Sequence, residues 1–156
     1  MQRIDVGPIG LDEECDEETT MFPMSCKAGG NCFAFPDVCK TPAPPAPSPV
    51  PIPYPNTAQV ATAVKTSTKV SVMNQPALNK GSEIPMSQGD EAGVAGGVTS
   101  GVNMQVVKYV MGYPKVKIEG MDAVGLMSTT GHNGSSANMP AGQQVAPSQS
   151  KVIIIP

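Results

Sequence analysis

Alternating apolar and polar positions recur along the chain after Asn56. Residues 65–73 (KTSTKVSVM) alternate polar with β-branched side chains, as half-buried strands do. Residues 105–111 (QVVKYVM) and 115–119 (KVKIE) have the same pattern and flank Gly112-Tyr113-Pro114, which predicts a hairpin turn. Glycine recurs every few residues as far as position 142, and that density breaks helices. The pattern predicts an all-β body of short strands and tight turns with little helix.

Three strand-like segments begin with Lys-Val: residues 69–72 (KVSV), 115–118 (KVKI) and 151–154 (KVII). The first two are followed by similar segments, MNQPAL and EGMDAV. Repeated units of this length stack or form a ring, because none can bury its apolar face alone. The pattern predicts two or three β units around a pseudo-axis, the alternative being coincidence among β-rich words. Residues 58–64 (AQVATAV) predict a helical turn or two.

A proline run separates this body from the N-terminal region. Residues 41–55 (TPAPPAPSPVPIPYP) hold eight prolines, and every second residue from Pro47 to Pro55 is proline. Proline fixes φ and lacks an N–H donor, so this stretch can be neither helix nor central strand. We expect an extended, polyproline-like segment of roughly 45 Å, at about 3.1 Å per residue. A spacer between domains is the alternative.

The N-terminal region divides into two parts. Residues 1–25 predict an irregular arm, in which positions 12–18 (DEECDEE) hold six acidic residues. Residues 25–40 hold three cysteines around Gly29-Gly30 and predict a compact loop region that needs a crosslink. We therefore divide the chain into an acidic arm, residues 1–25, and a β-rich domain, residues 26–156.

Composition narrows the range of partners. The 156 residues include no Trp and only 4% aromatic residues, which predicts a slim or layered body. The net charge is −3 without a basic cluster, so nucleic acid and anionic membrane surfaces are poor partners. No segment has the pattern of a secretion signal, and the longest apolar run, residues 152–155, is far short of a membrane span. We expect cytoplasmic assembly and no stable membrane insertion.

An ordered series of motifs resembles a known family. Residues 35–42 (FPDVCKTP) and 51–56 (PIPYPN) resemble the opening of PAAR-like proteins. Residues 89–93 (GDEAG) are similar to the family's middle motif, and residues 116–120 (VKIEG) and 132–134 (HNG) match its closing part. Each motif alone is weak, but their order is specific.

The resemblance, which covers about residues 29–154, implies a spike tip of a contractile injection machine, such as a type VI secretion system or a phage-tail-like particle. Such a tip is a small β-rich cone on the blunt end of a trimeric β-helical spike, which it sharpens and can load with effectors. The implied partner is a trimeric spike protein, with one tip per trimer. We expect residues 152–155 and 50–54 to form the base, and firing to carry the tip outside the cell or into a target cell.

The resemblance also implies zinc near the apex, held by Cys and His. Ala123 and Gly125 stand where many relatives place a Cys and a His, and the cysteines before the proline run replace them in our interpretation. Four N/S ligands would close a tetrahedral structural site. We predict a structural Zn²⁺ held by Cys26, Cys32, Cys39 and His132. The alternatives are free buried thiols with a turn-capping histidine, or a disulfide.

Two functions remain open from the sequence. The first is a structural tip, and the second is an effector or cargo adaptor whose acidic arm docks the cargo. We expect no enzymatic activity, because the chain has no Gly-x-Ser-x-Gly elbow and no nucleotide-binding loop. A Cys39 nucleophile with His132 as base would also lack an evident third residue to orient it.

Overall fold

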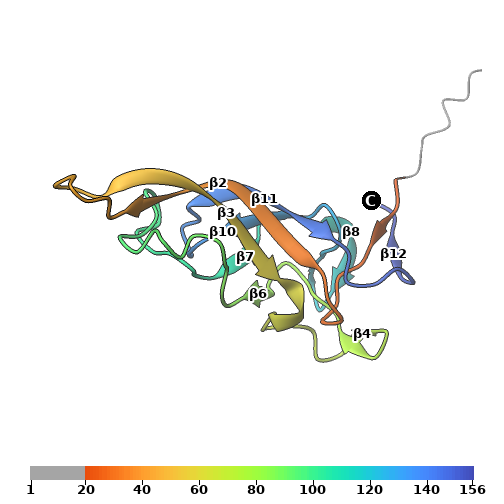
Figure 1. Ribbon diagram of the computed structural model, residues 1–156. Coiled ribbons are helices and arrows are strands. Elements are labelled where there is room, and N and C mark those ends of the chain that lie inside the picture. The colour runs from red at the N-terminus through yellow and green to blue at the C-terminus, as the bar shows by residue number, and fades with distance from the viewer. Residues whose placement is uncertain (1–19) are drawn as a thin grey trace, which may run out of the picture.

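A long antiparallel hairpin dominates the computed structural model, which describes residues 20–156 (Figure 1). It consists of β2 (Asn31–Thr41) and β3 (Val50–Gln59). The acidic segment at positions 12–18, with Cys15, lies outside the described residues. The other strands are β1 (Phe22–Pro23), β4 (Ser71–Val72), β5 (Gln75–Pro76), β6 (Glu83–Ile84), β7 (Val107–Tyr109), β8 (Tyr113–Ile118), β9 (Met121–Ala123), β10 (Thr129–His132), β11 (Met139–Ala146) and β12 (Ile153–Ile154).

The main sheet has six strands in the order β3-β2-β11-β10-β7-β6, and every pair is antiparallel. Three two-stranded sheets complete the fold: β1-β12, β4-β5 and β8-β9. The predicted all-β class is confirmed. Among residues 20–156 the helical content is one 3₁₀ turn at Val60–Thr62, inside the segment predicted to form helical turns. None of the described helices is long and apolar enough to cross a membrane.

A break in register lets both halves of β2 face the interior. Cys32 and Ala34 are buried at even positions, whereas Asp37 and Cys39 are buried at odd positions. The pairing of β2 with β3 shifts between Ala34 and Asp37, as at a β-bulge, and such a shift exchanges the two faces of a strand. The compact loop predicted over residues 25–40 is wrong for most of its length, because residues 31–40 are strand.

The prolines of β3 lie on the open edge of the sheet. Lys40 donates its N–H to the carbonyl of Gly96 (2.8 Å), so its backbone polar groups point away from β3. Pro51 lies opposite Lys40, and Pro53 opposite Val38 two residues along, so both prolines turn their donor-free backbone outward. The prediction that this run cannot be a central strand is confirmed, since β3 is an edge strand.

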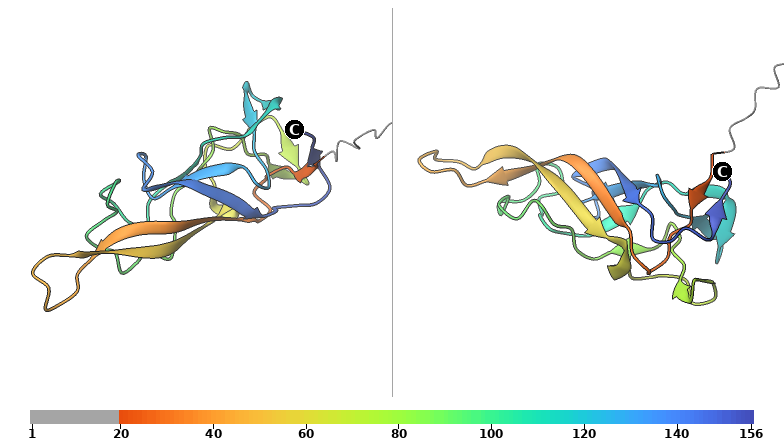
Figure 2. Two further views of the ribbon diagram at one scale, coloured as in Figure 1. Left: turned by 90° about the horizontal axis from the view of Figure 1, so that it is seen from above. Right: turned by 45° about the vertical axis from the view of Figure 1, so that its right-hand side comes forward.

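The loop between β2 and β3 forms the narrow end of the molecule. Figure 2 shows it projecting alone, opposite the end that holds β12 and the C-terminus. A single extended rod over residues 41–55 is wrong: residues 42–49 turn, with Ala46 N–H bonded to the Ala43 carbonyl (2.9 Å). We call this region, residues 35–56 with the segments packed on it, the hairpin end.

The opposite end is built from the Lys-Val repeats. The sheets β4-β5, β8-β9 and β1-β12 each contain one repeat, and the fourth residue of each repeat is buried in a shared apolar core. These equivalent residues are Val72, Ile118 and Ile154. We call this region the three-unit end. Three β units therefore share one core, in agreement with the two or three units predicted from the repeats, and the pseudo-axis stays a prediction.

Two expectations about local structure need correction. The hairpin predicted at Gly112-Tyr113-Pro114 is wrong: β7 belongs to the six-stranded sheet, whereas β8 pairs with β9 in another. The arm predicted over residues 1–25 overlaps the fold, because Phe22–Pro23 pairs with β12. Met24 and Ser25 are buried. The ordered body therefore includes residues before the predicted boundary at residue 26.

Candidate metal centre

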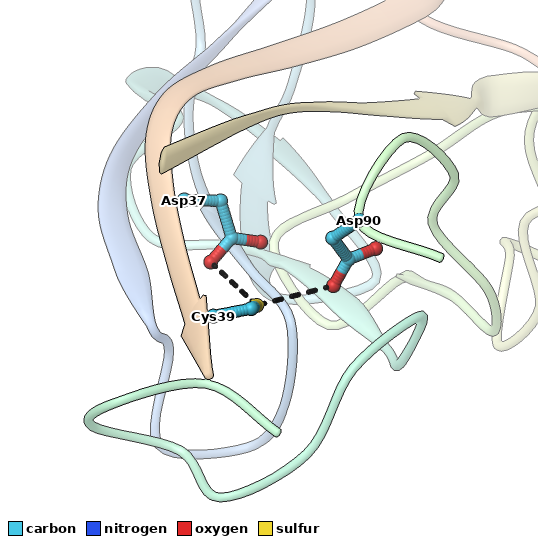
Figure 3. Close-up of side chains that lie close together, drawn as sticks. All are labelled: Asp37, Cys39 and Asp90. Carbon is cyan, nitrogen blue, oxygen red and sulfur yellow. Dashed lines mark hydrogen bonds between the residues drawn. The ribbon is translucent and has the colours of Figure 1, made fainter. Parts of the chain in front are cut away.

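Three side chains with metal-ligating atoms converge at the hairpin end. Asp37 and Cys39 come from β2, and Asp90 comes from the loop between β6 and β7 (Figure 3). Their donor atoms lie within 4.8 Å of one another, and all three residues are fully buried. The Cys39 Sγ lies 3.9 Å from Asp37 Oδ1 and 3.6 Å from Asp90 Oδ2. This group can hold a metal ion.

The backbones of β2 and of the loop between β6 and β7 allow the three side chains to come close together. Asp37 and Cys39 are two residues apart on one strand, so they share a face. Gly89 has φ +117°, and a Cβ there would lie 2.0 Å from the Pro55 carbonyl oxygen. A Cβ on Gly93 would lie 2.3 Å from the Cys39 Cβ. The glycines of the GDEAG motif therefore let the loop carry Asp90 against β2.

Three asparagines donate hydrogen bonds into this group. Asn56 Nδ2 donates to Asp37 Oδ2 (2.5 Å), and Asn133 Nδ2 donates to Asp90 Oδ2 (2.8 Å). The Asn138 side-chain amide donates to Asp37 and to the Val38 carbonyl. These amides fix the two carboxylates in place without supplying charge.

The electrostatics of the group disfavour negative charge. Burial, followed by the nearby carboxylates of Asp37 and Asp90, raises the pKa of the Cys39 thiol to about 12. Burial also raises the pKa of Asp90, and the charge of Asp37 adds to the effect. One oxygen of the buried Asp90 carboxylate, Oδ1, has no hydrogen-bond partner. A bound cation would relieve these costs together.

His132 lies next to this group with both ring nitrogens occupied. Its Nδ1 lies 3.0 Å from Asn56 Oδ1, and its Nε2 lies 3.0 Å from Thr130 Oγ1. Because the Asn56 amide nitrogen faces Asp37, its Oδ1 must accept, so we assign the proton to His132 Nδ1 and let Nε2 accept from the Thr130 hydroxyl. Burial lowers the His132 pKa to about 4. The neutral ring thus joins Asn56 to Thr130 through two buried hydrogen bonds.

Cys26 and Cys32 lie in two different apolar cores. Cys26 packs with Ala77 and Ile118 at the three-unit end. Cys32 packs under the main sheet, with its Sγ 3.9 Å from the Tyr109 hydroxyl, and burial raises its pKa to about 12. Both are free thiols, as is Cys39, so the disulfide alternative is not realised among the described cysteines.

The structure therefore does not gather the four predicted ligands. Within residues 20–156, the group of close ligand atoms joins Cys39 to Asp37 and Asp90, not to Cys26, Cys32 or His132. Zinc binding itself stays a prediction.

The two carboxylates were missed from the sequence, although a signal was present. Asp37 and Asp90 both lie inside quoted motifs, FPDVCKTP and GDEAG. Asp37 stands two residues before Cys39, the spacing that places side chains on one face of a strand. A loop over residues 25–40 has no such alternation of faces, so the predicted loop gave no reason to pair Asp37 with Cys39.

Comparison with known proteins places this arrangement in a family. The family model described as the toxin PAAR-like domain matches residues 30–141. This range contains the whole hairpin. It also contains the buried polar group, by which we mean the three residues with metal-ligating atoms together with the asparagines and the histidine around them: Asp37, Cys39, Asn56, Asp90, His132, Asn133 and Asn138. No match was found among curated proteins or among solved structures. Because the matched range covers well over half of the chain, this protein belongs to the toxin PAAR-like domain family.

Proposed function

We propose that this protein is the tip that caps and sharpens the trimeric spike of a contractile injection machine. Membership in the PAAR-like family supports a spike-tip or toxin-associated role in such a system. The observation that carries the finer proposal is the three-unit end, where Val72, Ile118 and Ile154 occupy equivalent positions around one core. Three similar units give one chain a surface that can face three identical spike chains.

The three-unit end also exposes apolar side chains, as a docking surface requires. Ile155 is 56% exposed and follows the buried Ile154 directly. Exposed apolar residues on this end come from each of the three units: Val70, Met73, Met121, Ile153 and Ile155. Residues 50–54, the other segment expected at the base, lie in the hairpin with Val50 paired to Thr41, at the opposite end of the molecule (Figure 2). The proposal therefore places the base at the three-unit end alone and the hairpin at the apex.

Native mass spectrometry of the tip mixed with its cognate spike protein tests the proposal. We expect one tip per three spike chains. Ile155→Asp should weaken the complex, because it places a charge in the docking surface. Val145→Asp is the matched control, since Val145 is 52% exposed on β11 outside the three units. A complex with one tip per spike chain, or equal loss in both variants, would contradict the proposal.

Cargo loading remains the alternative role. It depends on the acidic segment at positions 12–18, which lies outside the described residues. Deleting residues 1–19 leaves β1 and its pairing with β12 in place. A variant without this arm that still caps the spike but no longer carries an effector would assign the arm to cargo.

The proposal includes no catalysis. A thiol with a pKa of about 12 is a poor nucleophile near neutral pH, and His132 has both nitrogens engaged.

The proposal retains the structural Zn²⁺ expected from the sequence, because a metal at the narrow end would replace apolar core that cannot form there.

A further inference from the structure

We infer that Asp37, Cys39 and Asp90 together bind one divalent metal ion, which ties β2 to the loop between β6 and β7. This inference deepens the proposed tip function, on which its purpose rests, and it replaces the ligand set expected from the sequence.

The charge balance of the group calls for a cation. Asp37 and Asp90 are both fully buried, and carboxylates in such places are normally paired or bound to metal. Among the described residues, the acidic partners of ion pairs are Glu83 and Asp122, not these two. The donors that reach Asp37 and Asp90 are side-chain amides, a backbone N–H group and the Cys39 thiol, and none of them carries a positive charge.

One buried oxygen supports the same conclusion independently. Asp90 Oδ2 accepts from the Met104 N–H (3.1 Å) and from Asn133, whereas Oδ1 has no partner. An unpartnered buried acceptor loses its hydrogen bonds to water without replacing them, so native structures rarely keep one without a reason. A metal ion at Asp90 supplies that reason.

The donor set selects the class of metal. Two carboxylates with one thiolate form a mixed hard and soft set. Ca²⁺ and Mg²⁺ prefer all-oxygen sites, whereas Zn²⁺ accepts sulfur and oxygen together. The site therefore suits Zn²⁺, or Co²⁺ as its spectroscopic substitute. Three protein ligands are one fewer than in closed structural zinc sites, so we expect the ion to be removable by a chelator.

The surrounding amides hold the ligands ready. Asn133 Nδ2 lies 3.5 Å from Cys39 Sγ while also donating to Asp90. Asn138 Nδ2 donates to Asp37 and lies 3.9 Å from Cys39 Sγ. Groups that orient metal ligands in this way support affinity without touching the ion.

Metal binding by the purified full-length chain tests the inference. The protein is stripped with EDTA under reducing conditions, titrated with Zn²⁺ alone, and assayed by elemental analysis after dialysis. We expect one Zn²⁺ per chain. Co²⁺ should give the near-ultraviolet charge-transfer band of a thiolate–cobalt bond, and Cys39→Ser should abolish that band.

Matched variants separate this site from the expected quartet. Asp90→Asn and Cys39→Ser should each weaken Zn²⁺ binding by about tenfold or more. Cys26→Ser and Cys32→Ser should keep wild-type affinity, since both cysteines lie in apolar cores and neither belongs to the group around Cys39. Circular dichroism of each metal-free variant confirms the fold.

Absence of Zn²⁺ from the wild type after titration would overturn the inference. So would wild-type affinity in Asp90→Asn, or loss of zinc in Cys26→Ser or Cys32→Ser with the fold intact. None of these measurements involves the spike. Failure here leaves the proposed tip function standing, and failure to bind the spike leaves the metal site standing.

Discussion

At the three-unit end, Val72, Ile118 and Ile154 meet in one apolar core, whereas the hairpin end buries Asp37, Asp90 and His132. The two ends belong to one chain, yet different interactions hold them. The three-unit end gathers β strands from three separate parts of the sequence. The hairpin end is narrow, because two strands project beyond the rest (Figure 1).

The difference follows from the ratio of surface to volume. A narrow projection buries little apolar area, so hydrophobic stabilisation there is weak. Directional interactions then carry more of the stability: asparagine amides, the neutral His132 and, in our inference, a metal ion. The three-unit end can instead depend on apolar burial, which requires only that side chains fill the space. The comparison predicts that the two ends respond to different perturbations.

The largest effect on stability is expected from shortening side chains in the apolar core of the three-unit end. Ile118→Ala and Ile154→Ala should each destabilise the protein by about 2–5 kcal/mol, because each leaves a cavity at a position that is 2% exposed. Chemical denaturation at neutral pH measures this. Val152→Ala is the control, since Val152 is 40% exposed and should change stability little. If the losses of stability in the two isoleucine variants differ from each other as much as they differ from the loss in Val152→Ala, the two isoleucines are not equivalent members of one core.

An intermediate effect is expected at the hairpin end from acid. His132 has a folded-state pKa of about 4 and an ordinary value of 6.5, so between these pH values the unfolded chain binds the proton and the folded chain does not. Stability should therefore fall as the pH drops from 6.5 to 4, by up to about 3 kcal/mol from this group.

His132→Asn removes the titrating group while keeping a donor toward Asn56. Its stability should be lower at neutral pH but should depend less on pH between 4 and 6.5 than that of the wild type. Denaturant midpoints across this range give the comparison. If the stability of His132→Asn depends on pH as steeply as that of the wild type, protonation of His132 is not the cause of the acid sensitivity of the hairpin end.

The smallest effect on stability is expected at the edge of β3. Pro51→Thr and Pro53→Thr restore N–H donors on the open side of the strand, so the edge can pair with another copy. We expect less than about 1 kcal/mol of change in monomer stability. We also expect concentration-dependent association in light scattering. Pro47→Thr, in the loop outside the strand, should stay monomeric. Monomeric edge variants would show that proline is not what protects this edge.

The sequence by itself determined the fold class and the repeated units. Glycine and proline exclude long helices wherever they are dense, and the Lys-Val repeats specify local strands whose equivalent residues became buried. It also determined that the proline run cannot sit inside a sheet, because proline has no N–H to donate. The ordered motifs were enough to indicate the family that residues 30–141 confirm.

Tertiary structure decided which residues meet. Cys32 and Cys39 look alike in sequence, but the register shift in β2 and the packing beyond it send Cys32 to an apolar core and Cys39 to the polar group. Asp90 reaches Cys39 across 51 positions of sequence, through a loop that closes because Gly89 and Gly93 lack a Cβ. Such contacts depend on the path of the whole chain, whereas spacing along the sequence reports only local geometry.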